Sequence, residues 1–166
     1  KRTCFNTFYP FKIFPEMRLA PIDFDSITML YGGNGSGKST LINLVPRIYD
    51  ATEGQVIVDG VNVKDYTIEQ LNNKIGYIAQ KAVLFSGTVK DNITMGFKEN
   101  EKPTEANVEK AIEVSQSSFV YNLPDGVYSR IDQGGKNVSG GQKQRISIAR
   151  ALARDPEILI FDDSFS

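Results

Sequence analysis

The 166-residue chain contains no histidine and a single cysteine, Cys4. A lone cysteine cannot close an internal disulfide, and no zinc-ligand spacing is present, so these scarcities favour a reducing setting. No apolar run approaches the roughly 20 residues that cross a bilayer, and no signal-peptide pattern occurs. The formal net charge of −1 provides no bulk attraction to nucleic acid or to an acidic membrane surface. What remains is the composition of an ordinary globular domain.

The ends of the sequence suggest a larger parent protein. The chain does not begin with Met, and it stops at Phe165-Ser166 directly behind an apolar run. We therefore expect a fragment that is truncated at its C-terminal side and inactive by itself.

Hydrophobic periodicity predicts an α/β fold, with irregular or short β structure over residues 1–26. Predicted strands are Ile27–Tyr31, Lys74–Ala79 and Ile158–Phe161, the last buried on both faces, and Gln55–Val63 reads as a hairpin that turns at Asp59-Gly60. Predicted helices are Ser39–Tyr49, Thr67–Asn73 and Ser139–Arg154, and the first is expected to kink at Pro46. A further helical region is predicted over Thr88–Ser118, interrupted by the charged stretch Lys98–Pro103. Ser139 is the expected N-cap of the last helix, whose apolar face is expected to hold Ile148, Ala149 and Leu152.

The stretch Gly32–Thr40 fits the phosphate-binding pattern G-x-x-x-x-G-K-[S/T] without a mismatch. Glycine lets backbone N–H groups approach phosphate oxygens closely, because no Cβ intervenes. A strand is predicted before the stretch and a helix after it, so these N–H groups would form an anion-binding nest. Lys38 would contact phosphate, Ser39 would bind Mg²⁺ and Thr40 would contact phosphate. The predicted loop residues are Gly33, Asn34, Gly35, Ser36, Gly37, Lys38, Ser39 and Thr40.

Two acids, Asp162 and Asp163, follow the predicted strand Ile158–Phe161. Carboxylate and hydroxyl oxygens suit Mg²⁺, which also binds substrate phosphate. We expect Asp162 to bind the metal and Asp163 to orient or deprotonate an attacking water.

A second predicted anion site lies at Val138–Gln142. A serine and two glycines begin a helix there, so N–H groups and the positive end of the helix point outward. Because the chain already has its own phosphate loop, a second phosphate receptor makes sense if it serves another subunit's nucleotide.

In this order and spacing, the chain resembles the nucleotide-binding domain of ATP-binding cassette (ABC) proteins from about Gly32 to Ser166. Gly32–Thr40 is similar to Walker A, Val138–Gln142 to the signature motif and Ile158–Asp162 to Walker B. The resemblance implies a P-loop NTPase fold with a RecA-like core, an ABC helical subdomain and an N-terminal β portion. It also implies ATP and Mg²⁺ as ligands and a second nucleotide-binding domain as partner.

Individual roles follow from the resemblance. Lys38, Gln80 and Asp163 are the expected catalytic residues, and Ser39, Gln80 and Asp162 the expected metal site. Gln80 matches the Q-loop glutamine, which in the family couples to the transmembrane domains. Tyr9 is the candidate for the aromatic that stacks on adenine, with packing in the β portion as the alternative. The signature residues that would contact the partner's nucleotide are Ser139, Gly140, Gly141 and Gln142.

The segment Gln80–Ile93 resembles the exporter version of the Q-loop region. Gln133–Asn137 precedes the signature where exporters often carry an X-loop, and Gln133 stands where a glutamate is usual. The expected division is 1–81 for the β portion with the Walker A and Q-loop part of the core, 82–153 for the helical subdomain, and 154–166 for the returning Walker B strand. The expected location is the cytoplasmic face of the cell membrane, beside a transmembrane domain of the same polypeptide.

One departure affects the mechanism. Active ABC ATPases usually carry a glutamate where this chain has Asp163, whose carboxylate reaches roughly 1–1.5 Å less far. The pattern is similar to the degenerate-site subunit of bacterial heterodimeric multidrug exporters, whereas a homodimer with aspartate as a weaker base is the alternative. A non-transporter ABC ATPase, and a module in which ATP promotes dimerisation with little turnover, stay open as other functions.

Overall fold

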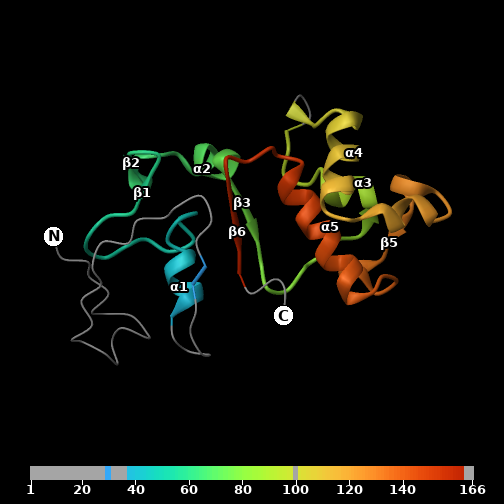
Figure 1. Ribbon diagram of the computed structural model, residues 1–166, viewed down its shortest axis with the longest axis horizontal. Helices are drawn as coiled ribbons and strands as arrows, with labels where there is room; N and C mark the ends of the chain where they lie inside the picture. The colour runs from blue at the N-terminus through green and yellow to red at the C-terminus, as the bar shows by residue number, and fades with distance from the viewer. Residues whose placement is uncertain (1–28, 31–36, 99–100, 163–166) are drawn as a thin grey trace. The chain divides into compact units, whose positions relative to one another are not determined.

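The computed structural model describes residues 29–30, 37–98 and 101–162, and the chain divides into two units, 1–72 and 73–166, each described by itself (Figure 1). The expected N-terminal β portion, Tyr9, Gly33–Ser36 and Asp163 lie outside the described residues. Of the predicted strand Ile27–Tyr31, only Met29 and Leu30 are described, and neither is part of a strand.

In the first unit, helix α1 (Lys38–Ile42) is shorter than the predicted helix Ser39–Tyr49. Asn43 is its C-cap, and the chain continues through turns in which Leu44 N and Val45 N bond to carbonyls only three residues back. Pro46 explains the end of the helix: it lacks an N–H, and its ring would clash with the carbonyl four residues earlier, that of Ile42. Proline therefore ends this helix and does not kink it.

The predicted hairpin is confirmed, with β1 (Ile57–Val58) antiparallel to β2 (Val61–Asn62). Asp59 and Gly60 form its two-residue turn with φ angles of 52° and 76°. Positive φ at both positions is the requirement of a type I′ turn, for which Asp-Gly is a favoured pair. The short helix η1 (Val63–Asp65) follows, and Arg47 Nη1 donates to the carbonyls of Val63 (3.4 Å) and Tyr66 (3.3 Å).

Helix α2 (Ile68–Lys74) leads directly into β3 (Ile75–Ile78), and both agree with the predicted elements. In the second unit β3 pairs in parallel with β6 (Ile158–Phe161), aligning Ile75 with Ile158 and Ile78 with Phe161. Gly76 permits this close packing, because a Cβ there would lie 2.8 Å from both Leu159 Cδ2 and Pro156 Cγ.

The predicted burial of both faces of β6 is wrong. Ile160 is 8% exposed, but Leu159 is 40% and Phe161 36% exposed. The strand's partner among the described residues is β3, so the apolar run reflects one covered face. An apolar run by itself does not report how many layers cover a strand.

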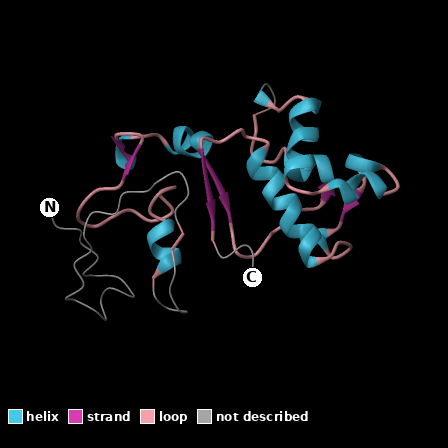
Figure 2. Cartoon of the chain, viewed as in Figure 1, coloured by secondary structure: helices cyan, strands magenta, loops and turns pink. Residues whose placement is uncertain are grey.

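The helices of the second unit surround one core (Figures 1 and 2). Helix α5 (Gly140–Leu152) contacts α3 (Val89–Ile93), α4 (Glu105–Val114) and β3. The core comprises Leu84, Val89, Ile93, Val108, Ala111, Ile112, Val120, Ile131, Ile146, Ala149 and Ala153. The remaining short elements are β4 (Gly87–Thr88), η3 (Ser118–Asn122), η4 (Gly126–Tyr128), β5 (Arg130–Ile131) and η5 (Gln133–Gly135).

The caps of these helices follow their sequences. Thr88 begins α3 in a capping box with Asp91, and the hydrogen bond from the Thr88 backbone N–H lowers the pKa of the Asp91 carboxyl. Thr104 caps α4, and Ser139 caps α5 as predicted. The predicted apolar face of α5 is partly wrong: Ala149 is buried, but Ile146 fills the core where Ile148 was expected, and Ile148 is only half-buried.

Candidate nucleotide-binding site

The described part of the phosphate loop begins at Gly37, which has φ 84° and stands as the N-cap of α1. This left-handed conformation favours glycine. No side chain caps α1, and the N–H groups in the first turn of a helix are the ones that an anion can satisfy. Lys38 and Thr40 are half-buried and Ser39 is exposed. These residues lie in the first unit, and the other described site residues lie in the second.

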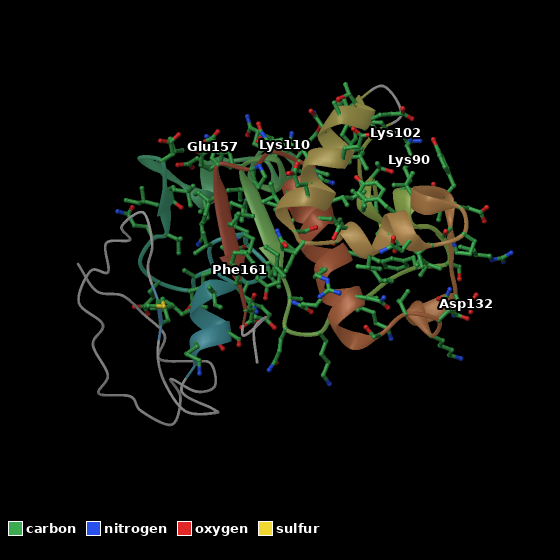
Figure 3. The ribbon with its side chains drawn as sticks, turned by 45° about the vertical axis from the view of Figure 1, so that its right-hand side comes forward. Lys90, Lys102, Lys110, Asp132, Glu157 and Phe161 are labelled. Carbon is green, nitrogen blue, oxygen red and sulfur yellow. The ribbon has the colours of Figure 1, made fainter. Side chains whose placement is uncertain are left out.

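Gln80 and Asp162 lie at the same edge of the β3–β6 pair, because they follow the carboxyl ends of two parallel strands. The Asp162 backbone N–H donates to the Ile78 carbonyl at 3.0 Å, so the ladder continues one residue past β6. Figure 3 shows Glu157 and Phe161 at opposite ends of β6, and Asp162 follows Phe161. Gln80 is exposed and Asp162 is half-buried. The structure thus places two of the three predicted metal ligands at the same edge of the strand pair.

Asp162 has a side-chain partner that the sequence analysis did not single out. The Tyr77 hydroxyl donates to Asp162 Oδ2 at 3.0 Å. A polar aromatic residue in an otherwise aliphatic strand was a usable signal. The pairing itself joins residues 85 positions apart and has no local signature.

Ser139 and Gln142 form a capping box at the start of α5. Ser139 Oγ accepts from the Gln142 N–H at 3.3 Å, and Gln142 Oε1 accepts from the Ser139 N–H at 2.8 Å. Both side chains therefore bond the backbone of their own helix. The Ser139 hydroxyl acts as acceptor in this cap, which leaves its proton to donate elsewhere.

Gly140 and Gly141 are exposed, and apart from the adjacent residues and the backbone of α5 itself, no heavy atom in the described part of the chain lies within 4 Å of a Cβ built at either position. Packing within the chain therefore does not require glycine at either position. Glycine at the start of a helix instead leaves the first N–H groups accessible to an outside anion.

Helix α5 is hydrogen-bonded through Arg150 to the segment that follows Gln80. Arg150 donates to the Asn92 carbonyl (2.7 Å), to Asn92 Oδ1 (3.0 Å) and to the Val83 carbonyl (3.0 Å). Asn92, which is 1% exposed, also bonds Phe85 N, Phe85 O and Thr88 O. Burial lowers the pKa of Arg150, although a guanidinium keeps its charge in proteins.

A further bond links α5 to the residue before Gln80, since Gln144 Nε2 donates to the Ala79 carbonyl at 3.4 Å. No role was predicted from the sequence for Gln144, Asn92 or Arg150. An asparagine next to Ile93 in the predicted helical region, four residues after Thr88, was the available signal for Asn92.

The donor atoms in each unit are of the kind that Mg²⁺ prefers. In the second unit Asp162 offers carboxylate oxygens and Gln80 an amide oxygen, and in the first unit Ser39 offers a hydroxyl oxygen. No group of three or more histidine, cysteine, aspartate or glutamate side chains gathers in the described ranges. Mg²⁺ usually takes several of its ligands from water and from substrate phosphates.

The structure also places Gln133, which stands where exporters often carry a glutamate. Gln133 lies in η5 and is exposed. Within the described segments, no helix is long and apolar enough to span a bilayer.

Comparison with known proteins agrees with the resemblance to ABC proteins that the motifs indicate. The family model described as ABC transporter matches residues 21–166. An uncharacterized ABC transporter ATP-binding protein of Mycobacterium tuberculosis is 47% identical over 140 residues, 84% of this chain and 24% of that protein. A putative multidrug export ATP-binding/permease protein of Staphylococcus aureus is 47% identical over 138 residues, 81% of this chain and 23% of that protein.

Among solved structures, a bacterial Atm1-family ABC exporter with ATP bound superposes with a TM-score of 0.72 at 35% identity, covering 80% of this chain and 23% of that one. The chain thus spans about a quarter of the length of the curated relatives it matches.

Proposed function

Because the chain belongs to the ABC transporter family, we propose that it is the ATP-binding domain of an exporter. MgATP binds between its Walker A loop and the signature of a second nucleotide-binding domain, and hydrolysis drives a substrate across a membrane. The parent protein carries the transmembrane domain, and the ATP-binding domain lies at the cytoplasmic face of the cell membrane as part of that transporter. The names of the S. aureus relative and of the Atm1-family structure support the exporter subtype.

The observation that carries this proposal is the start of α5. A Cβ built at either of its two exposed glycines would meet nothing within 4 Å in the described chain apart from adjacent residues and the helix backbone, so packing does not explain the glycines. The chain also has its own phosphate loop, so a second anion site would serve another nucleotide. Accessible N–H groups at the positive end of a 13-residue helix suit the phosphates of another subunit's nucleotide. The Ser139 hydroxyl, held as an acceptor by its own helix, donates its proton to that nucleotide.

Each residue then has a stated task. Lys38 neutralises phosphate charge, and Ser39, Gln80 and Asp162 hold Mg²⁺. The ion, when bound, offsets the negative charge that develops on the transferred phosphoryl group. Tyr9 stacks on adenine. Residues 1–81 and 154–166 form the core, and 82–153 form the helical subdomain whose bonds from Arg150 and Gln144 connect the signature helix to the Q-loop segment.

We further propose that the chain works in an asymmetric heterodimer. Asp163 replaces the usual glutamate, and a misplacement of about 1 Å can lower a catalytic rate on the order of 100-fold. The site built on this chain's Walker motifs would bind ATP and turn it over slowly. The intact signature would complete the competent site of the partner.

The binding half of the proposal is tested on the full-length protein with a fluorescent ATP analogue in the presence of Mg²⁺. Lys38→Ala should weaken binding by about tenfold or more, since a hydrogen bond to a charged group contributes 1.5–3 kcal/mol. Lys110→Ala removes an exposed lysine of α4 and is the matched control. Equal binding by both variants would refute a phosphate-contacting role for Lys38.

A further inference from the structure

Tyr77 lies outside every motif described above, yet its hydroxyl donates to the carboxylate of the predicted metal ligand Asp162. We propose that Tyr77 is a positioning residue that orients this carboxylate toward the Mg²⁺ of MgATP. The proposal deepens the proposed function and rests on it.

The backbone already places the two residues on one face of the β3–β6 pair. Tyr77 is aligned with Ile160 in parallel register, and side chains two apart in a strand point to the same face. Asp162 is two residues beyond Ile160, so its carboxylate projects from the face that carries the Tyr77 ring. The Asp162 N–H bond to the Ile78 carbonyl fixes its backbone, and the Tyr77 hydroxyl fixes its side chain.

The chemistry of the contact suits a supporting role. A phenol donates one proton, and an ionised carboxylate offers about four lone-pair sites, so one hydrogen bond orients the group and leaves it capable of metal ligation. Hydrogen-bond partners of metal-ligating carboxylates typically contribute 10–100-fold to metal affinity or activity. The bond is partly buried, where competition from water is reduced.

Packing alone explains the ring but not the hydroxyl. Tyr77 shares its strand with Ile75 and Ile78, and it is aligned with Ile160. An aliphatic or phenylalanine side chain at this position would pack beside Ile160 equally well. The hydroxyl reaches a carboxylate at the strand end, so Tyr77→Phe removes the proposed function and keeps the ring.

The test uses the full-length protein and the same fluorescent ATP analogue. Nucleotide binding is titrated with Mg²⁺ to find the half-saturating concentration, and nucleotide affinity is measured separately in EDTA. The matched control is Tyr66→Phe, which deletes another partly buried phenol, one that donates to the Val58 carbonyl at 3.2 Å. Tyr77→Leu, which removes ring and hydroxyl together, is the second variant.

Tyr77→Phe and Tyr77→Leu should each raise the half-saturating Mg²⁺ concentration about tenfold. Affinity in EDTA should stay unchanged in both, and Tyr66→Phe should match wild type throughout. An unchanged Mg²⁺ requirement in Tyr77→Phe, or a rise in Tyr77→Leu alone, overturns the proposal, as does an equal rise in Tyr66→Phe. Nucleotide binding by the wild type that ignores Mg²⁺ would instead refute the metal site of the proposed function, and this proposal with it.

Discussion

Ser139 combines a structural task and a proposed functional task at one atom. Its Oγ accepts from the Gln142 N–H at 3.3 Å as the N-cap of α5. Thr104 Oγ1 accepts from the Asn107 N–H at the same distance as the N-cap of α4. The two caps are therefore comparable in geometry, and only one of them belongs to the signature.

We predict that Ser139→Ala and Thr104→Ala each destabilise their own helix by about 1 kcal/mol. Hydrogen exchange of the α5 and α4 amides in the full-length protein measures this loss. Only Ser139→Ala should also slow ATP turnover of the assembled dimer, on the order of 100-fold, since it removes a donor aimed at developing charge. Equal turnover in the two variants would show that Ser139 is a cap and nothing more.

At the residue scale, the predictions that the structure confirms concern residues whose role is set by their nearest neighbours in the chain. Ser139 as an N-cap and Asp59-Gly60 as a turn are such cases, because the bonds or φ angles involved are set within four residues. It could not find the bond from Tyr77 to Asp162, which depends on two strands lying side by side. The roles assigned to Asp163 and Tyr9 stay predictions.

At the scale of elements, hydrogen bonds of the Asn92 side chain connect α3, α5 and the segment 83–88. Its side chain accepts from the Phe85 N–H and from Arg150, and it donates to the carbonyls of Phe85 and Thr88. A hydrophobic or truncated side chain at this position would leave several buried polar groups without partners. Each such group costs about 1–3 kcal/mol.

We predict that Asn92→Ala lowers the unfolding free energy of this region by about 3 kcal/mol, with faster hydrogen exchange in both α3 and α5 of the full-length protein. The control is Asn107→Ala in α4, whose exposed side chain should change stability by no more than about 0.5 kcal/mol. Exchange that accelerates in α3 alone would mean that Arg150 does not couple the two helices through Asn92.

The elements themselves were predictable to the extent that their patterns are local. α2, β3, β6, the hairpin and α5 follow from apolar period, turn residues and caps. The length of α1 was wrong because the clash between Pro46 and the Ile42 carbonyl outweighed an apolar spacing that otherwise favoured a longer helix. β4 and β5 are two residues each and pair Gly87 with Ile131, a contact that no local pattern indicates.

At the scale of the whole molecule, the proposed asymmetric heterodimer has the largest consequence, because it assigns different roles to the two ATP sites. A chain whose own Walker site is slow and whose signature motif is intact needs a partner with a fast Walker site. This chain's signature would complete that site. The two ATP sites should then respond differently to substitution. In the proposed heterodimer, changes at Asp163 act on this chain's own site, whereas changes at Ser139 act on the partner's site.

We therefore predict little ATP turnover by the full-length wild-type subunit alone and strong turnover when its partner subunit is added. In the mixed dimer Asp163→Asn should leave most of the turnover, while Ser139→Ala should remove it. Asp163→Glu should add activity to this chain's own site, because the longer side chain recovers roughly 1–1.5 Å of reach. Steady-state phosphate release from purified dimers measures all three variants. Robust turnover by the lone wild-type subunit, abolished by Asp163→Asn, would instead identify a homodimer in which aspartate is a competent base.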